Sequence, residues 1–246
     1  MTAPTPPPPP RCAGEGESEN PTRLPHAWDV SPDEARAIQA RLRPLVRQTP
    51  SLALDQIHTV AGVDVAYVAD GERADGSVAG RAAVSVWSLP NLIEIERATA
   101  VQAVSFPYVP GLLSFREAPA ALAALARLGN RPDLLLCDGQ GYAHPRRFGL
   151  ACHLGVFLDC PSVGCAKTRL IGTYDEPGDA RGAWSPLRDG DEVIGAVVRT
   201  RAGTRPVYVS VGHRVDLATA IAVVLRCARA YRLPEPLRAA DHLTRV

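Results

Sequence analysis

The sequence predicts an α/β fold in which one mixed sheet carries helices on its faces. Three strand-like runs come first, at residues 60–67, 82–89 and 92–101, with no helical pattern between them. From about residue 119 onward, helical and strand-like patterns alternate. Consecutive strands favour an antiparallel meander, whereas alternation favours parallel strands joined by helices, so the two patterns together predict a mixed sheet.

The chain before this sheet divides into a tail and one helix. Residues 1–25 are rich in Pro, Thr, Glu, Gly and Ser, a composition that buries too little apolar surface to become ordered. A helix is expected over residues 31–47, because the Ser31 hydroxyl can cap a first turn that contains Pro32. Residues 26–246 are long enough for one sizeable core, so we expect a single domain after a disordered tail.

The meander is supported by its turn and by its alternation. Pro90 and Asn91 separate the second run from the third, which is the length of a short hairpin turn. Apolar and polar residues alternate from residue 93 to residue 96, as expected of a half-exposed strand. The first three strands are therefore predicted to lie antiparallel.

The second half of the chain supplies the alternating elements. An alanine-rich and leucine-rich helix is expected over residues 119–128, where Gly129 ends it, and an apolar strand over residues 133–138. The elements expected after them are a helix at 148–158, strands at 162–166, 193–199 and 207–211, and a helix at 216–231. Residues 175–191 are rich in Gly, Pro, Asp and Arg, which predicts a mobile surface loop.

The composition gives no strong overall charge, and it contains one lysine whose position is informative. The formal net charge is +1, so binding to a polyanion would need a local basic surface and not a global field. Among the 27 Lys and Arg residues only Lys167 is a lysine. A lysine offers a compact point charge where the planar guanidinium of arginine does not fit, which makes Lys167 a candidate site residue.

Cysteine usage and hydropathy bear on location. The six cysteines form no C-x-x-C pair, and the chain start shows no charged segment followed by an apolar one. We therefore expect free thiols in a reducing cytoplasm. No run approaches the ~18 apolar residues of a membrane span, so no membrane association is expected.

Three carboxylates stand where a site could form. Asp64 lies in the middle of an apolar strand, Asp138 ends another, and Glu117 begins a helix. An aspartate in such a strand is more often paired with an arginine or faces solvent. If all three converge, however, they need a cation to remain ionised, and hard oxygen ligands select Mg²⁺ or Mn²⁺.

The loop after Asp138 has features of a phosphate or base site. It contains Gly139, His144, Arg146 and Gly149 just before a helix. Glycines let backbone N–H groups approach a ligand closely, and arginines next to a helix start suit phosphate. The alternative is a flexible basic turn.

Two further side chains are presented by loops. Pro107 and Pro110 stiffen the segment that carries Tyr108, so that this ring could insert between bases, although a core or surface tyrosine is the alternative. His213 follows a strand and precedes a helix, where it could act as a metal-proximal acid or base. A structural histidine that caps the helix is an equally good interpretation.

Six motifs in order give the sequence a resemblance. They read Gly62-Val-Asp-Val65, Pro107-Tyr-Val-Pro-Gly-Leu-Leu-Ser-Phe-Arg-Glu117, Asp138-Gly-Gln-Gly141, His144-Pro-Arg146, Gly164-Cys-Ala-Lys167 and Gly212-His-Arg214. In this order and at these spacings the chain resembles endonuclease V, the deoxyinosine-specific nuclease family, from about residue 60 to about residue 236.

The resemblance implies a ribonuclease H-like fold and a role in DNA repair. It implies Mg²⁺-dependent hydrolysis, with Mn²⁺ able to substitute, of the second phosphodiester bond 3′ to deoxyinosine, leaving 3′-hydroxyl and 5′-phosphate ends. By motif position Asp64, Glu117 and Asp138 match the metal ligands, Lys167 the site lysine and His213 the histidine near the metal. The predicted nucleic-acid contacts are the strand-separating wedge Tyr108 with Pro107 and Pro110, then His144 and Arg146, and the base pocket Gly111, Leu113, Gly139, Gly149 and Gly164.

Two departures from the family pattern bear on base preference. Gln140 stands where the family often has His or Asn, and Cys165 stands where an aliphatic residue is usual. The expected partner is inosine-containing DNA, bound by a monomer. The alternatives are a nuclease of the same fold that prefers inosine in RNA or branched DNA, and a nucleic-acid binding module that has lost catalysis.

Overall fold

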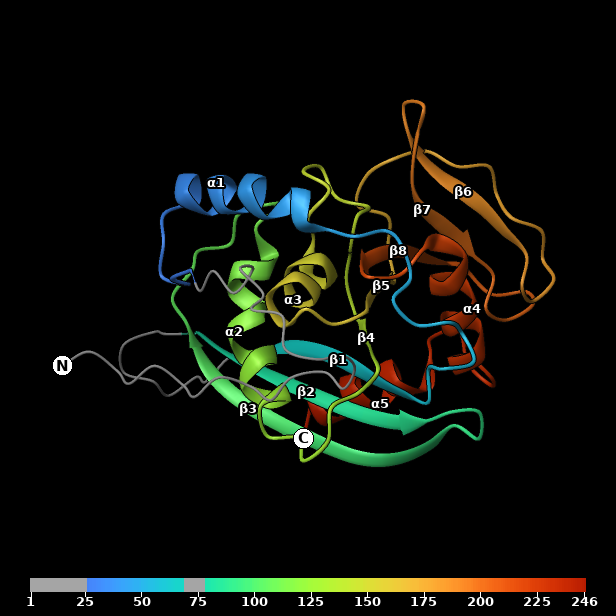
Figure 1. Ribbon diagram of the computed structural model, residues 1–246, viewed down its shortest axis with the longest axis horizontal. Helices are drawn as coiled ribbons and strands as arrows, with labels where there is room; N and C mark the ends of the chain where they lie inside the picture. Colours follow the sequence, from blue (N-terminus) through green and yellow to red (C-terminus); the bar gives the residue numbers. More distant parts are fainter. Residues whose placement is uncertain (1–25, 69–77) are drawn as a thin grey trace.

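The structure is a computed structural model that describes residues 26–68 and 78–246. Its centre is one eight-stranded sheet in the order β3-β2-β1-β4-β5-β8-β7-β6, with helices on both faces (Figure 1). The expected mixed sheet flanked by helices is confirmed. The predicted tail, residues 1–25, lies outside the described residues.

The first three strands form the predicted meander. They are β1 (Thr59–Val68), β2 (Val78–Ser88) and β3 (Ile93–Val104), and both pairings between them are antiparallel. β3 is the edge strand, and its burial alternates along its first half, as the residue pattern predicted. The meander occupies one half of the sheet.

Parallel strands extend the sheet on the other side of β1. β4 (Leu134–Cys137) pairs parallel with β1, and β5 (Ser162–Ala166) pairs parallel with β4. All residues of β4 and β5 are buried, as expected of strands covered on both faces. The sheet continues antiparallel through β8 (Val207–His213), β7 (Glu192–Val198) and β6 (Trp184–Asp189).

Two helices cover each face of the sheet. α2 (Leu113–Leu125) and α3 (Leu150–Leu158) pack on one face, and α4 (Leu217–Cys227) and α5 (Glu235–Leu243) on the other. Successive residues of β4 alternate between the two apolar layers: Leu134 and Leu136 join the α4 and α5 side, and Leu135 and Cys137 the α2 and α3 side. α1 (Pro32–Leu42) and the short 3₁₀ helix η1 (Arg43–Leu45) precede the sheet.

The structure corrects several predicted boundaries. The helix predicted to start at residue 119 begins at Leu113, and Pro119 lies inside it. The helix survives that proline because residues 118, 120 and 121 beside it are buried in the core, and tertiary packing outweighs propensity. The last predicted helix ends at Cys227 and not at residue 231.

Two elements were not predicted at all. β6 lies within the segment that was expected to be a loop. Its Pro186 argues against a strand, but β6 is at the edge of the sheet, where a missing backbone N–H is tolerated. α5 was not expected either. Within residues 26–68 and 78–246, no helix has the length and apolar character needed to cross a bilayer.

Candidate active site

The parallel strands deliver polar side chains to one edge of the sheet. Asp64 lies on β1, Asp138 directly follows β4, and Lys167 directly follows β5. The register pairs Val63 with Cys137, and the Asp138 N–H donates to the Val63 carbonyl at 2.9 Å. Because parallel strands end at the same edge, the three side chains meet there.

The helix α5 adds a third carboxylate to this edge. Carboxylate oxygens of Asp64, Asp138 and Asp241 all lie within 4.8 Å of one another, which is close enough to hold one metal ion. We call these three residues the carboxylate group. The Thr244 hydroxyl, one turn after Asp241, donates to Asp64 Oδ2 at 3.2 Å and fixes α5 against β1.

Sequence reasoning missed Asp241, although a signal was present. Leu237, Ala240 and Thr244 are almost fully buried, so they mark one apolar stripe along α5. Asp241 lies on the same stripe by helical periodicity. A carboxylate on a buried helical stripe is expensive unless it is paired or binds a cation, and that cost points to a site.

Lys167 lies beside the carboxylate group. Its Nζ lies 2.6 Å from Asp138 Oδ2 and 3.1 Å from Asp241 Oδ1. Burial works against the charged form of Lys167, but the hydrogen bonds and charges of the two aspartates outweigh it and raise its pKa. Burial also opposes ionisation of Asp241, yet hydrogen bonds from Lys167 and Arg245 lower the pKa of that carboxyl.

Glu117 lies beside the carboxylate group and not within it. It is 7% exposed, and the Tyr67 hydroxyl donates to its Oε1 at 3.3 Å. Burial, followed by the charges of Asp64 and Asp138, raises the pKa of Glu117 to about 8. For Asp64, burial and then the charge of Asp138 raise the pKa to about 6.

These carboxylates fit a divalent cation. The pKa values of Asp64 and Glu117 are raised because several carboxylates lie close together in a poorly solvated place. The single ammonium group of Lys167 does not offset this destabilisation of the ionised carboxylates. The donors are all carboxylate oxygens, which are the ligands that Mg²⁺ and Mn²⁺ prefer. The residues that could hold the ion are Asp64, Asp138 and Asp241, with Glu117 adjacent.

His213 does not lie at this edge. β8 runs antiparallel to β5, and His213 pairs with Ser162 at the start of β5, whereas Lys167 follows its end. The His213 Nε2 lies 3.2 Å from Asp159 Oδ1, and its Nδ1 accepts from the Arg47 N–H at 3.3 Å. The interpretation of His213 as a structural residue therefore agrees with its position, and a metal-proximal role does not.

The predicted wedge is a protruding loop that joins β3 to α2. Tyr108 is 72% exposed and stands between Pro107 and Pro110, which are also exposed. Gly111 has a φ of +77°, a backbone conformation that favours glycine, and it packs beside the Arg146 side chain.

The predicted base-pocket residues fall into two sets. Leu113 is 38% exposed at the start of α2, beside the wedge loop. Gly149 and Gly164 pack against the backbone of residues 139–141: a Cβ at 149 would lie 2.8 Å from the Gly141 carbonyl oxygen, and one at 164 would lie 2.7 Å from the Gly139 carbonyl oxygen. The absence of a side chain at Gly149 and Gly164 therefore allows residues 139–141, the glycine loop, to pack closely against β5 and the start of α3.

Gln140 and Cys165, the two departures from the family pattern, differ in their distance from the carboxylate group. Gln140 lies in the glycine loop, and its Nε2 donates to the Thr168 carbonyl at 3.0 Å, which ties that loop to the segment after Lys167. Cys165 is fully buried in the core on the α4 and α5 side. Gln140 is thus close to the site, whereas Cys165 only packs.

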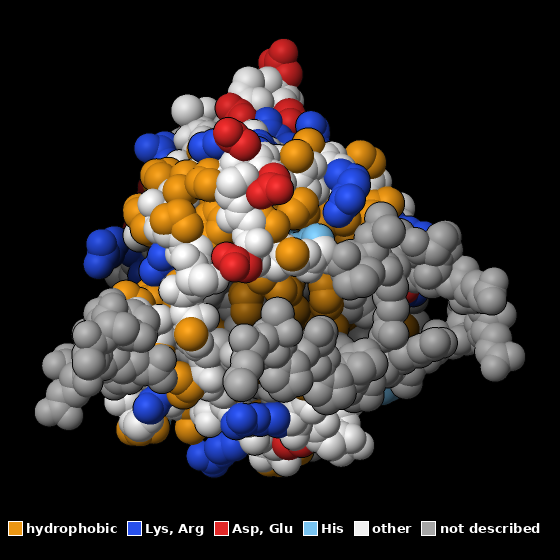
Figure 2. Space-filling view, turned by 90° about the vertical axis from the view of Figure 1, so that its left-hand side faces the viewer, with side chains coloured by type: hydrophobic (Ala, Val, Ile, Leu, Met, Phe, Trp, Pro, Cys, Tyr) orange, Lys and Arg blue, Asp and Glu red, His pale blue; other side chains and the backbone are white. Residues whose placement is uncertain are grey.

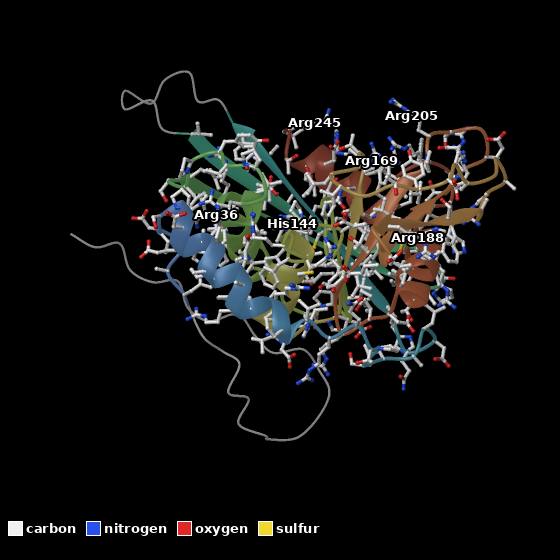
Figure 3. The ribbon with its side chains drawn as sticks, turned by 90° about the horizontal axis from the view of Figure 1, so that it is seen from above. Arg36, His144, Arg169, Arg188, Arg205 and Arg245 are labelled. Carbon is white, nitrogen blue, oxygen red and sulfur yellow. The ribbon has the colours of Figure 1, made fainter. Side chains whose placement is uncertain are left out.

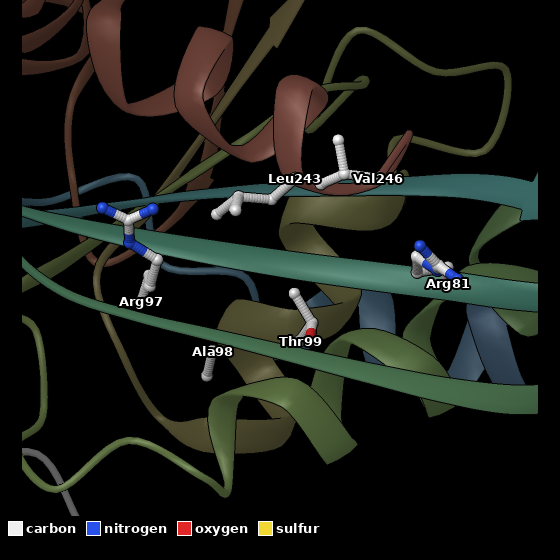
Figure 4. A pocket seen from close by; sticks show the side chains of 6 residues that line it. All are labelled: Arg81, Arg97, Ala98, Thr99, Leu243 and Val246. Atoms are coloured by element: carbon white, nitrogen blue, oxygen red, sulfur yellow. The ribbon is translucent and has the colours of Figure 1, made fainter.

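One cavity lies apart from these residues. It has a volume of about 310 Å³ and is lined by Arg81, Arg97, Ala98, Thr99, Leu243 and Val246 (Figure 4). It lies between β2, β3 and the end of α5, and includes none of the predicted site residues. The charged groups converge at the strand edge and not at this cavity.

Comparison with known proteins decides the family. The family model for endonuclease V matches residues 40–242, which includes every residue of the carboxylate group.

The chain belongs to the endonuclease V family.

Its endonuclease V relatives are similar over most of their length. The endonuclease V of Roseiflexus castenholzii is 56% identical over 218 residues, which are 89% of this chain and 94% of the relative. That of Nostoc sp. is 52% identical over 89% of this chain and 96% of the relative. Membership of this family makes the protein a nuclease.

Solved endonuclease V structures share the fold. The Streptomyces avermitilis enzyme superimposes with a TM-score of 0.80 at 47% identity, covering 91% of this chain and 96% of that one. Human ENDOV gives a TM-score of 0.78 at 34% identity, covering 87% and 97%. A Ciona intestinalis endonuclease V in complex with a 24mer DNA containing an inosine followed by a ribo-adenosine gives 0.72 at 26% identity, covering 87% and 95%. The expected ribonuclease H-like fold is thereby confirmed.

Proposed function

We propose that this protein is a divalent-metal-dependent endonuclease that cleaves DNA at the second phosphodiester bond 3′ to deoxyinosine. The observation that carries the proposal is the carboxylate group, three aspartates whose oxygens lie within 4.8 Å of one another beside Lys167. We take Mg²⁺ as the ion, with Mn²⁺ able to substitute. The products would carry 3′-hydroxyl and 5′-phosphate ends.

The roles of the chain's own residues follow from their charges and positions. A divalent ion would supply neutralisation of the attacked phosphate and a lowered pKa for the attacking water. Asp64, Asp138 and Asp241 would hold that ion, and Glu117 would add negative charge next to it. Lys167 is anchored by two of the aspartates, so it offers one fixed ammonium group to a phosphate oxygen.

Exposed arginines near the carboxylate group support a nucleic-acid substrate. Elsewhere, on the face in Figure 2, basic, acidic and apolar side chains are interspersed. Arg169 is exposed two residues after Lys167, and Arg245 is exposed beside Asp241, to which its Nη2 donates at 2.9 Å. Both lie on the same side of the molecule in Figure 3 and suit phosphates next to the cleaved one.

Inosine recognition is proposed from the loops and from the relatives. The Ciona intestinalis protein is described in complex with DNA containing an inosine. In this chain Tyr108 would fill the space left by an extruded base, and the glycine loop at 139–141 would contact that base through its backbone. We place the activity in DNA repair and in the cytoplasm, carried out by one domain of residues 26–246 acting as a monomer.

The deciding experiment is a nicking assay. The purified full chain is incubated with Mg²⁺ and a labelled duplex that contains one deoxyinosine, and the product is mapped to single-nucleotide resolution. We expect one cut after the nucleotide that follows inosine, lost on addition of a chelator and in Asp138→Ala. A matched strand with riboinosine tests preference for RNA. Equal cleavage of a duplex with adenosine in place of inosine, or no metal-dependent cleavage, would overturn the proposal.

A further inference from the structure

Gln39 is an uncharged polar residue whose side chain is buried beneath a helix. It lies on α1 and is 1% exposed. An amide that is removed from water at such a position is expensive unless its hydrogen bonds are made. The hydrogen-bond partners of the Gln39 side chain therefore indicate its structural role.

The Gln39 side chain joins two segments that are distant in sequence. Its Nε2 donates to the Gly111 carbonyl at 3.1 Å and to the Phe148 carbonyl at 3.2 Å. Its Oε1 accepts from Arg146 Nε at 2.5 Å. Both amide hydrogens are used, and the two carbonyl acceptors fix which end of the amide is nitrogen.

The Gly111 carbonyl is the point where this network converges. Besides Gln39, His144 Nε2 lies 3.0 Å from it and Arg146 Nη2 lies 2.5 Å from it. The His144 Nδ1 accepts from the Arg146 backbone N–H at 3.1 Å, so the ring proton is on Nε2, which donates to Gly111. Burial and then the charge of Arg146 lower the pKa of His144 to about 4, which keeps the ring neutral.

The opposite end of the same loop is also anchored. Arg116 Nη1 donates to the Phe106 carbonyl at 2.6 Å. At the Gly111 end, the Leu112 N–H also donates to the Val109 carbonyl at 2.9 Å. We call residues 106–112 the wedge loop. Its two ends are thus held by side chains from α1, α2 and the segment before α3, while Tyr108 between them is 72% exposed.

We propose that Gln39 is a positioning residue for Tyr108, and this rests on the proposed function. An aromatic side chain that separates base pairs has to keep its place against the stacking energy of the duplex. Tyr108 is too exposed to be held by packing, so its loop must be rigid. Gln39 supplies that rigidity because its one amide binds the Gly111 carbonyl at the end of the wedge loop and the Phe148 carbonyl just before α3.

The test compares two variants of the same helix. Gln39→Met keeps the length of the side chain and removes its donors and its acceptor. Leu42→Ala is the matched control: Leu42 is buried on α1 but donates nothing to the wedge loop. Urea unfolding measures the stability loss of each variant, so that effects on the loop can be separated from effects on the fold.

Hydrogen exchange on the full chain gives the first measurement. In Gln39→Met the peptide covering residues 106–112 should exchange about tenfold faster than in wild type, the factor expected for one lost buried hydrogen bond. In Leu42→Ala that peptide should exchange as in wild type. Unchanged exchange in Gln39→Met would overturn the proposal regardless of activity.

Cleavage gives the second measurement. With inosine in duplex and in single-stranded DNA, Gln39→Met should lose about tenfold in the ratio of duplex to single-strand rates, as Tyr108→Ala should, while Leu42→Ala keeps the ratio. The double variant of Gln39 and Tyr108 should lose no more than Tyr108→Ala alone. A normal ratio in Gln39→Met, or additive losses, would reject the positioning role. Inactive wild-type protein would instead reject the proposed function.

Discussion

Replacing Gly62 with alanine should displace α5 and, with it, Asp241 of the carboxylate group. Gly62 lies on β1, two residues before Asp64, and the backbone of α5 passes directly over it. A Cβ at 62 would lie 2.7 Å from the Leu237 N and even closer to the Pro236 carbonyl, whereas ordinary contact begins at 3.4 Å. The start of α5 must therefore move by more than 0.7 Å, the difference between these two distances.

That displacement has two measurable results. Overpacking of this kind typically costs about 1–3 kcal/mol of unfolding free energy. Because α5 carries Asp241, the carboxylate group loses its spacing, and a misplacement of about 1 Å can cost about 100-fold in rate. Gly62→Ala should therefore lower both the urea midpoint and kcat in the nicking assay.

Gly80 provides the matched control. It is also a strand glycine, but a Cβ there would lie 3.2 Å from Val104 Cγ2, the end of a side chain that can adjust. Gly80→Ala should keep near-normal stability and rate. If Gly62→Ala unfolds and cleaves like wild type, the reasoning that α5 must touch β1 to place Asp241 is wrong.

Three other variants test the site and its surroundings. Lys167→Arg should lower kcat at least about tenfold, since a planar guanidinium cannot fit the place of an ammonium 2.6 Å from Asp138; normal turnover would refute the argument from the lone lysine. Asp241→Asn should weaken Mn²⁺ binding, measured by calorimetry, at least about tenfold, and wild-type affinity would remove Asp241 from the ligands. His144 has a folded pKa of about 4, below its unfolded value, so its contribution to stability is present above pH 6.5 and is lost as the pH falls toward 4. Metal-free wild type should thus lose up to about 3 kcal/mol relative to His144→Asn over that range, and a constant difference in urea unfolding would contradict it.

Much of the fold was predictable because the strongest patterns were also the buried ones. The meander and the β4 strand follow from alternation and from apolar runs, which report burial directly. β6 and residues 113–118 of α2 were missed because Pro186 and Pro119 argue against strand and helix. At those positions the sheet edge and the helix packing decide the outcome, and neither is visible in local sequence.

The site was predictable to the extent that it sits on strand ends. Convergence of the carboxylates of Asp64 and Asp138 was expected from the sequence, and Lys167 was singled out because it is the one lysine. Asp241 was not placed with them, because its helix was not expected and the contact of that helix with β1 depends on Gly62. His213 was misplaced because a histidine at a strand end was interpreted without knowing that β8 runs antiparallel to β5.

The carboxylate group joins residues that are made far apart in time during synthesis. Thr244, which anchors α5 on Asp64, follows that residue by 180 positions. On the ribosome, β1 and its aspartate leave the exit tunnel long before Asp241 does. A nascent chain can therefore pair β1 with its neighbouring strands before residue 241 emerges, and the three carboxylates come together only after α5 has been made.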